Sequence, residues 1–229
     1  MRKRKKSGLL LSLFLLVFAT PLFAQQQIKI GTDVPLQYAL AYAYTPEKGL
    51  GGGVKIGLLA EPHNSIILAL MEALGTKEYI TAIVRESFKM GIVLDGNMAW
   101  NWSKNFAGLN VSYINLKAGQ APLNAIDENY GGIFNLIPSS LFSDETMAIN
   151  LSSNLIQIGA HYGRRIPLDD KWELQLLLGV SKNIGSTNQF TSDFPYPQSL
   201  FNSIDEDLQE NYKKYGIIPS IGIHLVYNL

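Results

Sequence analysis

Six ionisable side chains are the residues best placed to do chemistry, because each lies opposite a stripe of large apolar residues in an alternating segment. They are Lys55, Asp95, His161, Arg165, Glu173 and His224. Enclosed together, such groups could relay a proton or bind a polar solute. Charges in a narrow interior must pair or stay hydrated. We therefore predict an ion-pair network that fills the interior, with a proton relay or a solute site as the alternative.

A second candidate for chemistry is the run His63-Asn64-Ser65, which follows Glu61. It resembles the His-x-Ser element of outer-membrane lipid A deacylases, in which a histidine activates a serine and a carboxylate orients the histidine. Pro62 and the helical pattern after Ser65 depart from the strand context of that family. A serine that caps a helix explains the motif equally well. We therefore expect no catalytic residues, and a lipid-modifying enzyme is the least favoured function.

The first 24 residues have the composition of a secretory signal peptide. A basic stretch at residues 2–6 precedes an apolar run at residues 9–19, and Ala24 stands before the expected cleavage point. The apolar run is too short to span a bilayer, which takes about 20 residues. We expect residues 1–24 to be removed and residues 25–229 to form one mature domain.

The composition of the mature chain excludes several classes of function. Loss of five of the 19 basic residues leaves 14 Lys and Arg against 19 Asp and Glu, a net charge of about −5. No basic face remains for a nucleic acid. The absence of cysteine excludes disulfides and thiolate metal sites. No phosphate-binding glycine loop or metal-spaced cluster occurs, so we expect no metal, no cofactor and no nucleic-acid partner.

The last nine residues carry the strongest structural signal. From Ile221 to Leu229, large apolar residues alternate with small or polar ones, so the apolar set lies on one face of a strand. The segment resembles the C-terminal strand of outer-membrane β-barrels, in which such a stripe faces lipid. That resemblance implies two partners for this chain, the lipid bilayer and the outer-membrane assembly machinery.

Six earlier segments alternate in the same way, and each is close to the length that a tilted membrane strand requires. They are residues 34–44, 54–61, 90–102, 109–113, 156–163 and 172–181. Residues 27–32 supply an eighth strand, which gives the even number typical of bacterial barrels. A strand within residues 119–146 is the alternative source of that eighth strand.

The aromatic residues distinguish a membrane barrel from a soluble β-sandwich or a lipocalin-like barrel, which also alternate. Aromatic residues stand beside three short connections, at residues 45–50, 103–106 and 168–171. Tyr42 and Tyr44 precede the first, and all three tryptophans stand beside the other two. Amphipathic rings prefer the membrane–water interface. We predict an all-β, antiparallel membrane barrel of about eight strands, with the short turns in the periplasm and helical segments in the long extracellular loops.

The long connections contain helical patterns. Asn64 or Ser65 can cap a helix that Gly75 ends, and a second helix follows from Thr76. Ser203 and Glu206 form a capping box for a third helix. We predict that these helices form a cap over the extracellular mouth. Its apolar residues would be Ile66, Leu70, Met71, Ile204, Leu208 and Tyr212.

Together these features predict an outer-membrane protein without catalytic activity, in a structural or partner-binding role. The alternative is a carrier or channel for small apolar solutes, gated by the helical cap, because an apolar underside of the cap could bind an apolar small molecule.

Overall fold

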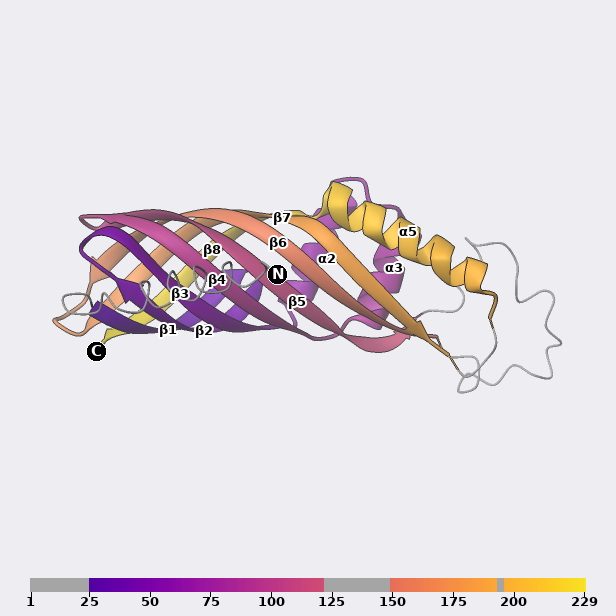
Figure 1. Ribbon diagram of the computed structural model, residues 1–229, viewed down its shortest axis with the longest axis horizontal. Helices are drawn as coiled ribbons and strands as arrows, with labels where there is room; N and C mark the ends of the chain where they lie inside the picture. Colours follow the sequence, from indigo (N-terminus) through magenta and orange to yellow (C-terminus); the bar gives the residue numbers. More distant parts are fainter. Residues whose placement is uncertain (1–24, 122–148, 193–195) are drawn as a thin grey trace, which may run out of the picture.

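The computed structural model describes residues 25–121, 149–192 and 196–229 and contains eight antiparallel strands closed into a barrel (Figure 1). This confirms the predicted fold class and strand number. The strands are β1 (Gln25–Val34), β2 (Gln37–Thr45), β3 (Lys48–Leu59), β4 (Gly91–Trp102), β5 (Asn105–Ala121), β6 (Ile149–Pro167), β7 (Trp172–Thr191) and β8 (Ile217–Asn228).

The barrel closes between its first and last strands. Ile30 of β1 pairs with Leu40 of β2 on one side and with Leu225 of β8 on the other. The strand predicted at residues 27–32 is therefore real and longer than expected. Residues 119–121 extend β5, whereas residues 122–146 lie outside the described part of the chain. Closure pairs every strand on both sides and removes the free edges of the sheet.

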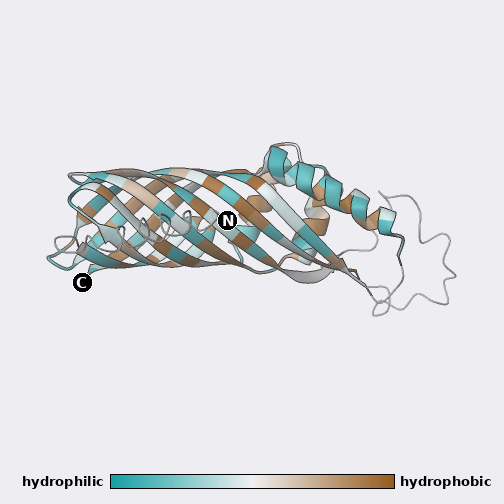
Figure 2. Ribbon diagram, in the orientation of Figure 1, coloured by the Kyte–Doolittle hydropathy of each residue, from teal (hydrophilic) through white to brown (hydrophobic). Residues whose placement is uncertain are grey.

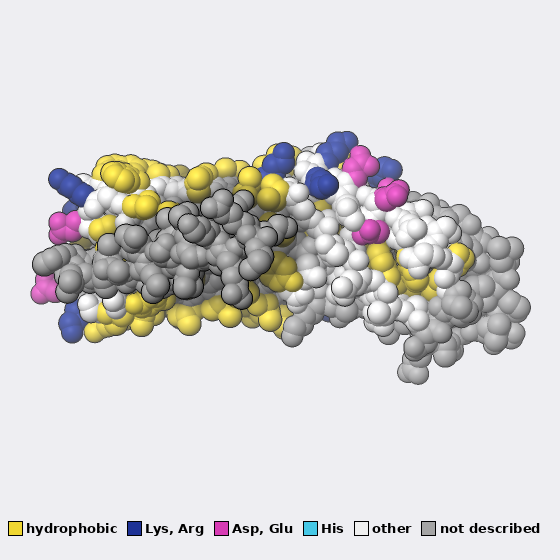
Figure 3. All heavy atoms as spheres, viewed as in Figure 1, with side chains coloured by type: hydrophobic (Ala, Val, Ile, Leu, Met, Phe, Trp, Pro, Cys, Tyr) yellow, Lys and Arg dark blue, Asp and Glu magenta, His cyan; other side chains and the backbone are white. Residues whose placement is uncertain are grey.

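Large apolar side chains cover the outside of the barrel. Leu109, Val54 and Leu178 are 68%, 65% and 60% exposed, whereas the inward residues between them are small or polar. Apolar residues alternate along the strands in Figure 2 and form a belt in Figure 3. Soluble monomeric proteins rarely expose an apolar surface of this extent to water. A closed barrel with an apolar belt is a structure that can span a bilayer.

Aromatic rings gather at the barrel end that carries the three short turns. Trp172 and Tyr227 lie with their ring centroids 5.0 Å apart, and Trp102 lies 6.3 Å from Tyr162. These side chains are exposed or half-buried. This placement matches the predicted aromatic girdle at one membrane interface.

The opposite end of the barrel is lopsided. Strands β5, β6 and β7 contain 17, 19 and 20 residues, whereas β1 and β2 contain 10 and 9. The long strands project beyond the others and contact two helices, α3 (Glu78–Ser87) and α5 (Gln198–Tyr215), and a further helix, α2 (His63–Ala73), packs on α3 (Figure 1). We call these three helices the cap. No helix in the described ranges is both long and apolar enough to cross a bilayer.

The main apolar core of the described residues lies between the cap and the projecting strands. Ile80 and Ile83 of α3 and Ile204 and Leu208 of α5 are completely buried there. Leu151 of β6 lies in the same cluster. Each fully buried side chain of this size stabilises the fold by about 1.5–3 kcal/mol. The cap is therefore packed onto the barrel rather than loosely attached.

Two of the predicted helix starts are wrong. α2 begins directly after Pro62 and has no side-chain cap. Asn64 lies inside the helix and donates its amide to the Lys89 carbonyl oxygen at 2.8 Å, which joins α2 to the α3–β4 connection. α5 begins after Pro197, because burial of Leu200 in the core adds turns before the predicted capping box. The helix ends are as predicted, at Gly75 (φ +100°) and Gly216.

Candidate functional site

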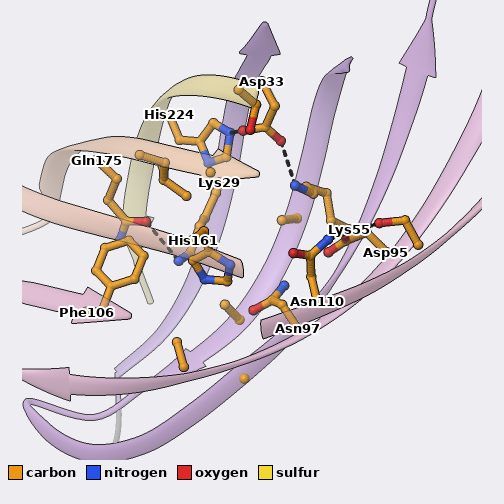
Figure 4. A pocket seen from close by; sticks show the side chains of 18 of the residues that line it. Lys29, Asp33, Lys55, Asp95, Asn97, Phe106, Asn110, His161, Gln175 and His224 are labelled. Carbon is orange, nitrogen blue, oxygen red and sulfur yellow. Dashed lines mark hydrogen bonds and ion pairs between the residues drawn. The ribbon is translucent and has the colours of Figure 1, made fainter. Parts of the chain in front are cut away.

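Two internal spaces are candidates for function. One is the barrel lumen, a space of about 90 Å³ whose lining includes ionisable and amide side chains (Figure 4). The other, which we call the cap cavity, is an apolar space of about 60 Å³ between the cap and the barrel mouth. A single water molecule needs about 10–15 Å³ of such space, so each space can hold only a few water-sized groups.

A carboxylate with two basic partners lies in the part of the lumen nearer the cap. Asp33 on β1 accepts a hydrogen bond from the Lys55 ammonium of β3 at 2.6 Å, and its second oxygen lies 2.9 Å from His224 Nε2 of β8 (Figure 4). The Asp33 and His224 side chains are almost fully buried. β8, which pairs with β1, and β3, which lies one strand further round the barrel, thus place two of the predicted site residues on an acid that is not among the six. The sequence could have indicated that Asp33 faces the lumen, because Asp33 continues the inward alternation of Lys29 and Gly31.

A second group in the lumen surrounds Asp95 on β4. One Asp95 oxygen accepts hydrogen bonds from the Ser112 hydroxyl at 2.6 Å and from the Asn110 amide at 2.9 Å. Lys55 acts electrostatically with this carboxylate as well as with Asp33. These interactions join the two groups into a single network across β1, β3, β4, β5 and β8.

The third group lies toward the end with the short turns. Glu173 accepts hydrogen bonds from the amides of Gln27, at 3.2 Å, and Gln175. Lys29 donates to the Gln175 amide oxygen at 3.0 Å, and its ammonium stands 5.9 Å from the centre of the Phe106 ring.

The remaining two predicted residues lie around the Phe106 ring. The Arg165 guanidinium lies 5.5 Å from the ring centre and donates to Asn101. The His161 ring lies 6.1 Å from the ring of Phe106. All six predicted ionisable residues therefore face the interior in three adjoining groups, and each cation has a carboxylate, amide or aromatic partner. Paired charges and a small free volume describe a filled interior.

The cap cavity differs in chemistry from the lumen. Its walls are formed by α2, by α3, by the end of α5 and by the strand ends at the barrel mouth. They include Leu68, Met71 and Phe88. No charged side chain lines it within the described ranges. Tyr212 is buried beside it, and that burial raises the pKa of the phenol, which therefore stays neutral at physiological pH.

The structure divides the six predicted cap residues into two sets. Met71 and Tyr212 line the cap cavity, and Ile204 and Leu208 lie in the apolar core between the cap and the projecting strands. Ile66 and Leu70 lie on the opposite face of α2 and do not reach the cavity. Helical spacing explains the division, because residues 66 and 70 share a face that residues 64, 68 and 71 do not.

The His63-Asn64-Ser65 run does not form a catalytic pair. The Ser65 hydroxyl donates to Glu61 at 2.8 Å, whereas His63 Nε2 lies 3.2 Å from the Thr32 hydroxyl. The His63 ring also packs against Tyr38, with centroids 4.4 Å apart. Burial lowers the pKa of His63, against an opposing effect of the Asp33 carboxylate. The histidine thus attaches α2 to the β1–β2 hairpin.

Comparison with known proteins gives structural alignments at low identity and low TM-score. No protein-family model and no curated protein matches the sequence. A major outer membrane protein from Thermus thermophilus aligns with 90% of this chain and 99% of its own, at 12% identity and a TM-score of 0.47. CarO of Acinetobacter baumannii aligns with 92% of this chain and 100% of its own, at 8% identity and a TM-score of 0.31.

Proposed function

We propose that this chain is an outer-membrane β-barrel of a Gram-negative bacterium that carries a folded helical cap on the cell surface, and that it has a structural or partner-binding role without catalysis. The apolar belt supports insertion into a bilayer. The signal-peptide pattern of residues 1–24 supports export. The observation that carries the proposal is the combination of a filled lumen with a mouth covered by the packed cap.

The orientation of the barrel gives a first prediction. Barrels of this class place short turns in the periplasm, so the cap should face the outside of the cell. A cysteine at Lys104 or Asp169, in two short turns, should be shielded from a membrane-impermeant thiol reagent in intact cells. A cysteine at Glu206, on the exposed face of α5, should be labelled. The chain has no native cysteine that would confuse the result.

Permeabilised cells provide the control for this experiment, because all three cysteines should then react. If intact cells label position 104 or 169 and protect position 206, the cap faces the periplasm and the proposed surface role is wrong.

The filled lumen gives a second prediction, which concerns conductance. The purified protein in a planar lipid bilayer should show no regular open-channel steps, because paired side chains occupy the lumen. Replacing residues 65–86 by a short turn removes α2 and α3 but leaves the lumenal network. We therefore expect this variant to remain closed to ions as well.

Both results bear on the proposal. Regular conductance steps in the parent protein would exclude the closed, structural role and favour a channel. Steps that arise only after removal of residues 65–86 would show that the cap, rather than the lumenal network, closes the barrel. That outcome would favour a gated pore.

A second candidate function is a carrier for small apolar solutes. The observation that favours it is the position of the cap cavity, which meets the lumen at a shared wall of Leu36, Ile114 and Gln157. Movement of these side chains would join an apolar space to a polar one. Uptake of a small apolar solute into vesicles that contain the protein, above the rate of protein-free vesicles, tests this candidate.

A further inference from the structure

The polar lining of the cap cavity consists of a few uncharged groups, and two of them are buried without a hydrogen-bond partner among the described residues. One is the hydroxyl of Tyr212, and the other is the side-chain oxygen of Asn183, which lies on β7 and is 4% exposed. A buried acceptor without a partner costs about 1–3 kcal/mol. A bound water or ligand is one way in which native proteins satisfy such a group.

The wall around Asn183 is otherwise apolar on most sides. Leu59, Leu68, Leu116 and Leu155 come from β3, α2, β5 and β6, and Val84 comes from α3. Elements far apart in the sequence thus line one small space, and its volume of about 60 Å³ corresponds to about four to six water-sized groups. A methylene group is similar in size to a water molecule, so a short aliphatic chain fits this volume.

We infer that the cap cavity binds one short, neutral aliphatic molecule whose terminal hydroxyl donates a hydrogen bond to Asn183. This inference rests on the second candidate function, the carrier, and names the chemical class of its solute. The lining offers an unused acceptor for a donor and, within the described ranges, contains no charge to pair with a carboxylate or an ammonium. A charged ligand would lose its hydration without compensation.

The approach to the cavity is also apolar. α2 forms one wall of the cavity with Leu68 and Met71. On the other face of the same helix, Ile66 is 37% exposed and Leu70 is half-buried. One apolar helix therefore separates the cavity from the surroundings of the barrel mouth, and an aliphatic solute meets an apolar surface along that helix face.

Binding can be measured with 4-fluorobutan-1-ol, which has six non-hydrogen atoms, by fluorine NMR relaxation of the ligand, with the protein in lipid nanodiscs and empty nanodiscs as the baseline. The parent protein should broaden the ligand signal beyond that baseline. Val84→Phe adds a ring to the cavity wall and should abolish the excess broadening. The matched control is Val54→Phe, which makes the same change on the lipid-facing surface and should leave binding unchanged.

A second variant tests the hydrogen bond separately from the space. Asn183→Leu keeps nearly the same size and removes the acceptor. It should weaken binding of the alcohol by about three- to tenfold and leave the binding of 1-fluorobutane, which lacks the hydroxyl, unchanged. The shift in electrophoretic mobility on heating confirms for each variant that the barrel is folded.

Three results would overturn the inference. They are no excess broadening with the parent protein, excess broadening that Val84→Phe does not reduce, and equal weakening of both ligands by Asn183→Leu. The vesicle uptake experiment reports on the carrier function separately. Alcohol binding without uptake keeps the site and rejects the carrier, whereas uptake without alcohol binding keeps the carrier and rejects this site.

Discussion

Replacing Asp33 by Asn should lower the free energy of unfolding by about 3–5 kcal/mol, the usual cost of leaving a buried charge without its partner. Lys55 and His224 both lie within 3 Å of the Asp33 carboxylate, and only 15% and 6% of their side chains are exposed. An asparagine keeps the size of the side chain but supplies no negative charge. The Lys55 ammonium then remains buried with less compensation.

Urea-induced unfolding in lipid vesicles, followed by tryptophan fluorescence, measures this loss. The matched control is Glu72→Gln, which breaks the exposed Arg85–Glu72 pair of the cap. Exposed pairs contribute about 0–1 kcal/mol, so the control should change little. A double variant, Asp33→Leu with Lys55→Met, removes both charges and should recover much of the stability.

The comparison of these three variants decides between two descriptions of the lumen. If Asp33→Asn costs no more than Glu72→Gln, the lumenal charges are hydrated rather than paired, and the closed interior proposed above is wrong. If the double variant is as unstable as the single one, the loss comes from shape rather than from charge.

The barrel itself could be predicted from the sequence because two environments act on every strand. One face meets lipid and the other a narrow lumen, so apolar and small or polar residues must alternate along residues 34–44 or 221–229 whatever the loops do. The inward position of His161, Arg165 and the other ionisable residues follows from the same alternation. The strand number then follows from the short turns and from the need for an even count.

The partners within the lumen could not be predicted in the same way. Alternation places Lys55 and His224 inward, but only the registers of β1 with β8, of β1 with β2 and of β2 with β3 show that Asp33 meets both. In the sequence, the proline at position 35 makes Asp33 resemble part of a turn. Long-range register is a property of the closed sheet and leaves no local signal in the chain.

Some features of the cap could not be predicted from the sequence either. The apolar stripe of α5 is visible in the sequence, yet the local capping signal at Ser203 predicts a start later than the observed one. Contacts of Leu200 with the core outweigh that signal. The cap cavity and its unpaired Asn183 arise from elements that are distant in the sequence. Neither feature has a local pattern that could have indicated it.

Replacing Val111 by Arg should destabilise the barrel by about 2–4 kcal/mol and reduce its assembly, because this side chain lies on the lipid-facing belt midway along the membrane part of β5. Val111 is 58% exposed on a surface that meets hydrocarbon rather than water. A guanidinium there must lose its hydration or distort the bilayer. The folded fraction after insertion into vesicles, seen as the heat-sensitive electrophoretic band, measures the effect.

The preceding residue supplies the matched control, because Asn110 points into the lumen and donates to Asp95 at 2.9 Å. Asn110→Arg adds the same charge one residue away but places it beside a carboxylate, so it should assemble far better than Val111→Arg. Equal assembly of the two variants would contradict the assignment of faces and, with it, the membrane barrel. Failure of Asn110→Arg together with normal assembly of Val111→Arg would indicate that the apolar belt faces inward.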